Sequence, residues 1–520
     1  MPIFCFIFTT IAEHAINIYF FFLYKEELNF SYYLCVLFDT LPEFLLTLFI
    51  IYNLFNFSNN FSESLFQVHL CFLIYSIVLL SLLIEIPFYF CLQTNVMFGY
   101  CWINSIYIII SKIAILSLIL VFLLISRKKI KAVIKLNLAW ELPLVLSYSI
   151  LFMFFLTSSY DLFGVYLSIE GLSLTLYVLS ALVSKSITSI EATVKYFSLG
   201  AISTGILLLG ISIIYGLVGC LDFITIQLYL GDVRSYYHFL ELKFGLVLIL
   251  ISFFFKISVF PCHVWIADVY EGVWTPITFF MSVVIKLTLI LFFIRFFFSV
   301  LFNVIFCFQF LLCFVSLGSL LIGALGALKQ TRIKRFIAYT SINQVGFIML
   351  GVSSCNNTGL ASVIVYLTAY IFMSIIFFII VLNTEHIVTQ KSLVHISDLY
   401  LYSQSNNRNS KYLLLTLMSM SGIPPLGGFL GKLYVYLSIV EARLDYIFLA
   451  SLLISILSTY YYLSLVRHIL FEKCFNLKLY YLSNKSSLSG TLKTSALMLT
   501  IYPLFIGLKI STLFWLLKNL

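Results

Sequence analysis

The sequence predicts an all-α polytopic membrane protein with about fourteen transmembrane helices, two of them broken. Its 520 residues are 62% hydrophobic and only 10% charged, whereas about a quarter of the residues in an ordinary soluble domain are charged. Apolar runs of about 20 residues, the length that crosses a bilayer, recur from one end of the chain to the other. These runs are continuously apolar and do not alternate, so a transmembrane β-barrel is excluded.

Each long apolar run justifies one helix of this prediction. In chain order, the predicted helices span residues 36–57, 66–91, 104–126, 141–157, 160–183, 193–219, 243–262, 276–299, 304–328, 334–352, 359–384, 411–439, 445–470 and 493–518. The helices belong to one transmembrane domain, residues 36–520. Residues 1–35 hold a further apolar stretch that Glu13 and His14 interrupt and that no small-residue cleavage site follows. This stretch is interpreted as an N-terminal extension, either an extra helix or a surface-lying one, and not as a signal peptide.

The basic residues gather in loops that these helices place on one side of the membrane. The four basic loops are residues 127–135, 329–335, 391–411 and 467–493, and the opposite loops have almost no lysine or arginine. By the positive-inside rule, the basic face is the cytoplasmic or matrix side. Because topology accounts for the net charge of +9, no nucleic-acid partner is expected.

The sequence contains no pattern for a bound cofactor or metal. Its 11 cysteines include no CxxC pair, so neither a disulfide framework, a zinc site nor an iron–sulfur cluster is indicated. A dinucleotide GxGxxG and a phosphate-binding GxxxxGK[ST] are also missing. Between the predicted helices, residues 221–243 are long enough to form a short surface hairpin or helix.

Four ionisable residues fall well inside predicted spans, namely Glu170, Lys256, Lys286 and Lys432. Each costs about 2.5–3.5 kcal/mol near a helix centre, so such residues usually face other helices, water or a partner charge. One alone would be explained by snorkelling or by a structural ion pair, but four together favour a function. Lysine suits proton handling because burial lowers its pKa from about 10.4 and an approaching carboxylate raises it again. Further ionisable residues lie closer to predicted helix ends: Glu85, Lys112 and Glu385.

Two of the predicted helices, the seventh and the twelfth, are interrupted by proline. Lys256 precedes Pro261 in the first, and Lys432 follows Pro424 and Pro425 in the second. Proline leaves a backbone carbonyl without its donor, which a membrane interior tolerates only inside protein or beside water. One broken helix in each half of the chain is typical of inverted-topology repeats in transporters. Transport is therefore the leading class, and two kinked helices at a packing site are the structural alternative.

Several ordered motifs resemble one family, the antiporter-like membrane subunits of proton-pumping NADH:quinone oxidoreductase, respiratory complex I, and among them the subunit 2 type. The motifs are "YDLFGVYLSIEGLSLTLYVLSA", "SIEATVKYFSLGAISTGILLLGISIIYGLVG", "FFFKISVFPCHVWIADVYEGVWTPITFFMSVVIK", "IKRFIAYTSINQVGFIMLG" and "SGIPPLGGFLGKLYV". The resemblance extends over about residues 140–470. The resemblance implies two inverted five-helix repeats, at about 141–299 and 304–470, followed by the C-terminal helix at about 493–518.

The resemblance also implies roles for individual residues. Glu170 matches the fifth-helix glutamate that pairs with a seventh-helix lysine, which is Lys256 here. Lys286 matches the eighth-helix lysine, and Lys432 matches the lysine on the exit side. His263 matches a histidine of the broken segment, where it either hydrogen-bonds exposed backbone or relays protons. Three further matches are interpreted as capping and loop-shaping groups near the start of the eighth helix: Asp268, Tyr270 and Glu271.

The family implies a non-redox, proton-translocating subunit of NADH:ubiquinone reductase. FMN, iron–sulfur clusters and ubiquinone are then expected in other subunits, and the partners are other membrane-arm and accessory subunits, the sister antiporter-like subunits and lipids. The 54 phenylalanines and 34 tyrosines are typical of an AT-rich organelle genome and favour the mitochondrial inner membrane, with a bacterial plasma membrane as the alternative. The alternatives for function are a subunit of a multisubunit cation/proton antiporter and a non-pumping structural membrane subunit.

Overall fold

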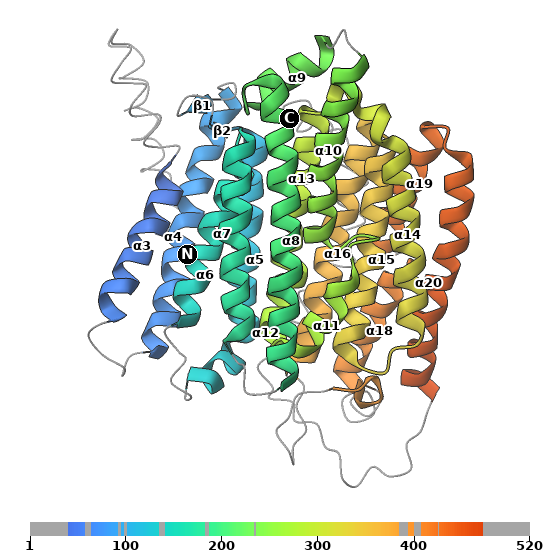
Figure 1. Cartoon of the computed structure of the whole chain (residues 1–520). Helices are drawn as coiled ribbons and strands as arrows, with labels where there is room; N and C mark the ends of the chain where they lie inside the picture. Colours follow the sequence, from blue (N-terminus) through green and yellow to red (C-terminus); the bar gives the residue numbers. More distant parts are fainter. Residues whose placement is uncertain are drawn as a thin grey trace.

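The computed structural model describes residues 40–57, 64–91, 95–97, 101–134, 141–182, 187–232, 236–383, 394–399, 407–424 and 426–471. Four predicted features lie outside these ranges: the extension 1–35, the helix 493–518, Glu385 and Pro425. In the described part, long helices run side by side as one bundle, and the chain passes from α3 at one edge to α20 at the other (Figure 1).

The first third of the bundle consists of α3 (Leu41–Phe57), α4 (Ser64–Cys91), α5 (Ile106–Ile134), α6 (Glu141–Ser158) and α7 (Leu162–Ala181). A small antiparallel hairpin, β1 (Asn95–Met97) and β2 (Trp102–Asn104), connects α4 to α5, where the sequence predicts a loop. Asp161 caps α7, because its side chain accepts a hydrogen bond from the Gly164 backbone N–H at 3.2 Å.

The middle third contains the first broken helix. Its elements are α8 (Ile187–Val218), α9 (Phe223–Asp232), α10 (Tyr236–Ile257), α11 (Val264–Gly272), α12 (Thr275–Phe279), the π-helical segment η1 (Phe280–Ile285), α13 (Lys286–Ser299) and the 3₁₀ segment η2 (Phe302–Phe308). The sequence predicts either a hairpin or a helix within residues 221–243, and the structure has the helix α9 there. The last third contains α14 (Gln309–Leu328), α15 (Ile333–Ser353), α16 (Asn357–Asn383), α18 (Asn407–Ser421), α19 (Gly427–Glu441) and α20 (Asp445–Phe471).

Nine helices in the described part of the chain are long and apolar enough to cross a membrane. Since a crossing takes about 20 apolar residues, this length and composition confirm the all-α membrane class. The count of fourteen helices and the division into two inverted repeats stay predictions.

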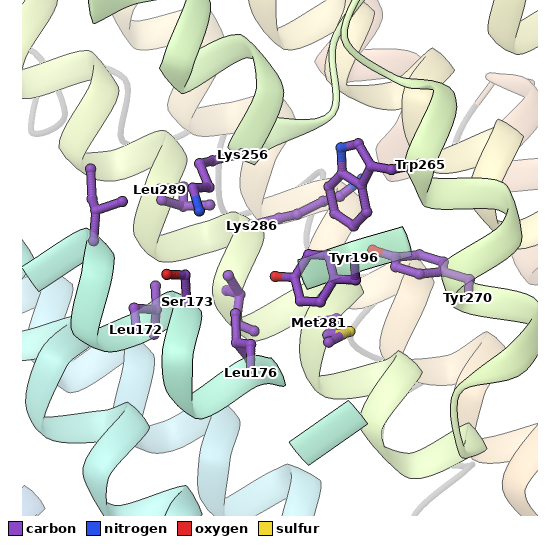
Figure 2. A pocket seen from close by; sticks show the side chains of 12 residues that line it. Leu172, Ser173, Leu176, Tyr196, Lys256, Trp265, Tyr270, Met281, Lys286 and Leu289 are labelled. Atoms are coloured by element: carbon purple, nitrogen blue, oxygen red, sulfur yellow. The ribbon is translucent and has the colours of Figure 1, made fainter. Parts of the chain in front are cut away.

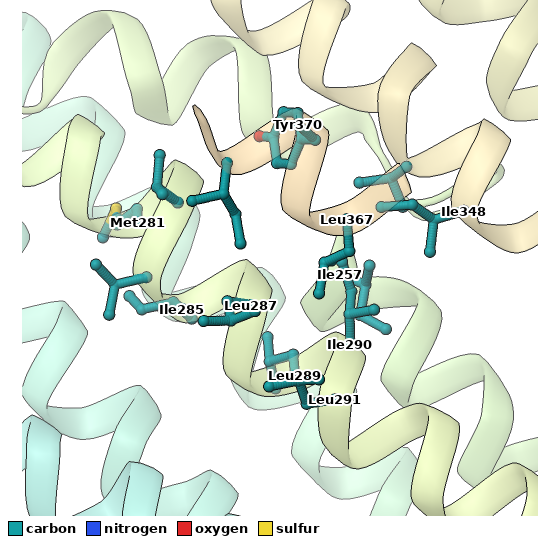
Figure 3. Packing of buried hydrophobic residues seen from close by; sticks show 14 of the residues in the cluster. Ile257, Met281, Ile285, Leu287, Leu289, Ile290, Leu291, Ile348, Leu367 and Tyr370 are labelled. Carbon is teal, nitrogen blue, oxygen red and sulfur yellow. The ribbon is translucent and has the colours of Figure 1, made fainter. Parts of the chain in front are cut away.

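The centre of the bundle is formed by α12, η1 and α13 together with α15 and α16. An 18-residue window of the span Thr275–Ser299 is 100% buried inside the protein, whereas the corresponding window of Asp445–Phe471 is only 33% buried. Figure 3 shows Leu287 and Ile290 of α13 among apolar side chains that include Ile348 and Leu367 of the neighbouring helices. A charged side chain on α13 is therefore surrounded by protein and has no short route to the lipid headgroups.

Both broken helices end their first half in the same way. Helix α10 stops before Ser258, whose φ is +66°, and α18 stops before Gly422, whose φ is +88°. A residue in this left-handed region is a common helix terminator. The predicted helix 243–262 therefore ends at Ile257, five residues early, and the predicted helix 411–439 divides into α18 and α19.

The described parts of the four basic loops lie at one end of the bundle. Lys129 donates to the Thr275 hydroxyl at 3.3 Å, and Lys334 donates to the Val273 carbonyl at 2.5 Å. Arg332 forms a backbone bridge with His395. A surface pocket at this end is lined by residues from three of the basic segments, the third of which contributes His468. The described parts of all four segments thus lie on one face.

Candidate functional site

Lys256 lies in the last turn of α10, directly before the first break. The carbonyl end of a helix carries partial negative charge, which favours an ammonium there. Glu170, on α7, interacts with Lys256 electrostatically, but the two do not form one of the ion pairs within 4.0 Å found among the described residues. One carboxylate oxygen of Glu170 is buried and has no hydrogen-bond partner in the described part. The Glu170 carboxylate and the Lys256 ammonium are therefore not in direct contact in this structure.

A small cavity connects Lys256 to Lys286 (Figure 2). It measures about 20 Å³, and both lysines line it together with Ser173, Tyr196 and Tyr270. A buried water needs roughly 10–15 Å³ of such space and a few polar partners. The cavity therefore has room for a water molecule between two amines that come from different helices.

Lys286 is the first residue of α13 and is only 3% exposed. Its ammonium donates a hydrogen bond to the Ser341 hydroxyl of α15 at 2.9 Å and lies 6.0 Å from the centre of the Tyr270 ring. None of the ion pairs in the described residues includes Lys286. Its charge is therefore held by neutral dipoles and a ring face.

The π-helical segment η1 directly precedes Lys286 in the chain. A π segment adds one residue to a helix, which turns everything after it by about 100° relative to a continuous α-helix. Tyr370 of α16 donates to the Ser282 carbonyl in this segment at 2.9 Å, so one of the displaced carbonyls has a partner. The sequence predicts an uninterrupted helix here and contains no signal for the residue that the π segment adds.

Lys432 belongs to α19, yet its ammonium reaches back across the second break. It donates to the Ser421 carbonyl at the end of α18 at 2.8 Å and lies 5.0 Å from the centre of the Phe347 ring. Gly422 leaves the space for this contact, because a Cβ there would lie 3.0 Å from Cδ and 3.2 Å from Nζ of Lys432. Lys256 and Lys432 fall on opposite sides of their breaks in the sequence. Lys256 belongs to the last turn of α10, and the Lys432 ammonium contacts the carbonyl of the last residue of α18.

Polar side chains extend from Lys286 toward the second break. Ser341 and Gln344 of α15 line another cavity of about 20 Å³ together with Tyr462. Gln344 accepts a hydrogen bond from the Tyr366 hydroxyl and donates to the Tyr462 hydroxyl at 3.4 Å. None of these residues is among those predicted from the sequence, although serine, asparagine and glutamine inside one apolar span could have pointed to them.

The residues expected to support the breaks are placed as follows. Pro261 and Pro424 lie between the two halves of their helices. The Phe255 carbonyl, near the end of α10, accepts a hydrogen bond from the Trp265 indole N–H at 3.0 Å. His263 precedes α11, and its buried Nδ1 has no hydrogen-bond partner among the described residues. The side chain that donates to the Phe255 carbonyl is therefore Trp265 and not His263.

Asp268, Tyr270 and Glu271 lie inside α11, the short helix that precedes α12. Asp268 pairs with Lys195 of α8 at 2.9 Å and with Arg335 of α15 at 3.3 Å. Glu271 pairs with Arg335 and Arg332. The two acids thus hold α11 between α8 and α15, while Tyr270 is buried and lines the cavity beneath Lys286.

Four buried charged residues lie outside this site, namely Glu43, Glu85, Lys112 and Arg295. Arg295 of α13, which the sequence analysis did not single out, donates to the Thr157 carbonyl at 2.5 Å and to the Ser159 carbonyl, so it caps the end of α6. Lys112 of α5 forms an ion pair with Glu43 of α3 at 2.5 Å, in which the side chains are 1% and 5% exposed. Among the described residues, no group of three or more His, Cys, Asp or Glu is placed to hold a metal ion.

Known proteins match this chain in sequence over most of the region that holds the site. The sequence model of the family described as NADH:quinone oxidoreductase/Mrp antiporter, TM, matches residues 159–458. NADH-quinone oxidoreductase subunit N of Pelagibacter ubique (strain HTCC1062) is 35% identical over 365 residues, which are 70% of this chain and 76% of that protein. Subunit N 1 of Rhizobium meliloti (strain 1021) is 36% identical and covers 64% of this chain and 69% of its own length.

Two solved structures share the fold. A chain in the structure of respiratory complex I from Thermus thermophilus with bound aureothin has a TM-score of 0.73 at 22% identity, covering 90% of this chain and 98% of its own. A chain of the Mrp complex from Dietzia sp. DQ12-45-1b has a TM-score of 0.75 at 17% identity, covering 92% and 96%. The chain therefore belongs to the transmembrane family of NADH:quinone oxidoreductase and Mrp antiporter subunits, and within it to the group of subunit N.

Proposed function

We propose that this chain is the proton-translocating membrane-arm subunit, of the subunit N or subunit 2 type, of a respiratory complex I. It moves protons through buried glutamate and lysine sites while electrons pass from NADH to ubiquinone in other subunits. The observation that carries the proposal is the shared cavity of Lys256 and Lys286, with the charge of Glu170 acting on Lys256. The chain itself carries out no redox step, and FMN, iron–sulfur clusters and ubiquinone are held by its partners.

The proposed proton step depends on the distance between Glu170 and Lys256. Close to the ammonium, the carboxylate stabilises the protonated lysine, and a contact of this kind is worth roughly 1.4 to 4 kcal/mol. When Glu170 withdraws, Lys256 loses that stabilisation and releases its proton through the cavity toward Lys286. Lys286 passes charge along the polar side chains of α15 and α16, and Lys432 serves the exit side.

The proposed surroundings are a coupling membrane and other integral subunits. The mitochondrial inner membrane is favoured by the high phenylalanine and tyrosine counts, with the basic face toward the matrix. The relatives named above are bacterial, and a bacterial plasma membrane is the alternative. The partners are the other membrane-arm and accessory subunits, including sister antiporter-like subunits, and the surrounding lipids.

Neutral replacement of the lysines tests the function. Lys256→Met and Lys286→Met should assemble into the complex but move fewer protons for each electron transferred, which is measured in everted membrane vesicles from the quenching of a pH-sensitive dye. Lys329→Met, at an exposed lysine of the basic face, is the matched control and should pump normally. Unchanged pumping in both buried variants would leave only the reading of a non-pumping structural subunit.

Assignment to a stand-alone cation/proton antiporter is the second candidate, because the Mrp chain shares this fold. Native gel electrophoresis separates the two. The band that contains this chain should show inhibitor-sensitive NADH:quinone activity. Its appearance in a small complex without a flavoprotein would favour the antiporter.

A further inference from the structure

A second pair of a glutamate and a lysine is buried in the first third of the bundle. The Lys112 ammonium of α5 donates to Oε1 of Glu43 of α3 at 2.5 Å and to the side-chain carbonyl of Asn104 at 3.3 Å. It also lies 5.8 Å from the centre of the Phe154 ring of α6. The family model matches residues 159–458, so this pair lies outside the matched region.

Stability alone does not account for the pair. Exchange of a buried ion pair for well-packed apolar residues is often neutral or stabilising, so the pair is weak evidence for a clamp between α3 and α5. The second carboxylate oxygen of Glu43, Oε2, is buried and has no hydrogen-bond partner among the described residues. An unsatisfied buried acceptor costs about 1–3 kcal/mol. A proton on Oε2 would remove the charge of the carboxylate and lower the cost of burying it.

The same chemistry occurs twice in this chain, in two arrangements. Glu43 and Lys112, like Glu170 and Lys256, come from different helices, and one oxygen of each glutamate is buried without a hydrogen-bond partner in the described part. Glu43 contacts its lysine, whereas Glu170 forms no such contact. A buried carboxylate that loses its ammonium partner binds a proton more tightly. The paired and the separated arrangement are the two states that proton exchange at such a pair requires.

The Glu43–Lys112 pair lies close to the face opposite the basic loops. The hairpin of β1 and β2 lies at that end of the bundle (Figure 1), and its residue Cys101 is exposed. Lys112 comes six residues after the start of α5 at Ile106, which is a depth of about 9 Å along the helix. Because Asn104 ends β2 and accepts from the Lys112 ammonium, it connects the pair to the hairpin.

Few other buried groups near the pair can titrate. On the described parts of α3 to α6, they are Cys71, Tyr75 and Glu85, all on α4. An ordinary thiol or phenol stays protonated at neutral pH, so Glu85 is the one carboxyl among them. Arg295 of α13 lies at the same end of the bundle and binds carbonyls of α6. A test of Glu43 must therefore distinguish it from Glu85.

We propose that Glu43 and Lys112, together with Asn104, form a second proton-binding site that exchanges protons with the face opposite the basic loops. A proton from water at that face adds to Oε2 of Glu43, and the ion pair becomes a carboxylic acid beside an ammonium. Loss of the same proton to water restores the pair. The ligand is the hydrated proton. The inference rests on the proposed function, since the site is assigned to a chain that translocates protons.

A neutral double variant separates a proton-binding pair from a structural one. Glu43→Gln/Lys112→Met keeps side chains of similar size without charge, and it should assemble but move fewer protons for each electron in everted vesicles. Glu241→Gln is the matched control, because that carboxylate is 60% exposed near the start of α10, at the same end of the bundle. The control should pump normally. A wild-type proton-to-electron ratio in the assembled double variant would overturn the proposal.

A second measurement does not depend on the double variant. A hydrophobic carbodiimide modifies a buried carboxyl group only when that group carries a proton, and mass spectrometry of the peptides distinguishes Glu43 from Glu85. In right-side-out vesicles, labelling of wild-type Glu43 should increase as the outer medium is acidified. Lys112→Met should be labelled at Glu43 already at neutral pH, because the carboxyl has lost its ammonium.

Two labelling results would contradict the proposal. If Glu43 is labelled in Lys112→Met but at no pH in the wild type, the pair is static. If Glu43 is not labelled in Lys112→Met, the carboxyl takes up no proton even without its partner. Failure of the proposed function gives a different result, in which Lys286→Met pumps normally while the labelling of Glu43 is unaffected.

Discussion

Replacement of Gly422 by alanine should disturb Lys432 without touching the lysine itself. Gly422 terminates α18 with a φ of +88°, and an added Cβ would lie 3.0 Å from Cδ and 3.2 Å from Nζ of Lys432. The Lys432 side chain would then have to shift by a few tenths of an ångström, which weakens the contact of its ammonium with the Ser421 carbonyl, now 2.8 Å long. We therefore expect Gly422→Ala to slow proton translocation in the assembled complex.

The free-energy cost of Gly422→Ala has two parts, and the control variant Gly219→Ala separates them. A left-handed alanine costs about 1–2 kcal/mol, and loss of a charge-assisted hydrogen bond costs about 1.5–3 kcal/mol. The second part corresponds to a roughly 10- to 150-fold lower occupancy of the Lys432–Ser421 contact. Gly219→Ala carries the first part alone, because Gly219 has a φ of +78° and nothing lies within 4 Å of an added Cβ.

The assay compares initial rates of dye quenching in everted vesicles, normalised to the amount of complex on a native gel. Gly422→Ala should pump more slowly than Gly219→Ala, and the double variant Gly422→Ala/Lys432→Met should be no worse than Lys432→Met alone. Equal rates for the two glycine variants would refute the reasoning that Gly422 holds the space for the ammonium. Additive losses in the double variant would show that Gly422 acts on something other than Lys432.

Three further predictions concern packing around the site. Glu43→Gln leaves the buried Lys112 ammonium without its carboxylate, which costs about 3–5 kcal/mol. Native gels should therefore show less assembled complex for this variant, with recovery in Glu43→Gln/Lys112→Met. Wild-type amounts of complex in the single variant would contradict this expectation. Tyr370→Phe removes the hydrogen bond to the Ser282 carbonyl, worth about 0.5–1.5 kcal/mol. This variant should therefore have a lower temperature midpoint of thermal inactivation of the complex. An unchanged midpoint would mean that the π segment does not depend on this bond. Asp268→Asn breaks two half-exposed ion pairs worth about 0–1 kcal/mol each. Because salt screens exposed ion pairs, we expect the variant to be less stable than the wild type only at low salt. An equal loss of stability at high salt would show that the ion pairs are not its cause.

The sequence determines the membrane class and the approximate position of most helices. Bilayer thickness sets the length of an apolar run, and an ionisable residue inside such a run is conspicuous because burying charge is costly. The same logic points to Glu170, Lys256, Lys286 and Lys432 and to the two proline breaks. It does not single out Arg295, which lies close to the end of the predicted helix 276–299 and donates to a carbonyl 138 residues away in the chain.

Only the tertiary structure decides which of these groups share a space. Lys256 of α10 and Lys286, which directly follows the π-helical segment η1, line one cavity, and the π segment leaves no mark in the hydrophobic pattern. Lys432 follows its break in the sequence, but the tertiary fold returns its ammonium to the end of α18 through the gap that Gly422 leaves. Hydrophobicity and length are properties of each segment alone, whereas proximity depends on how the helices are rotated and packed against one another.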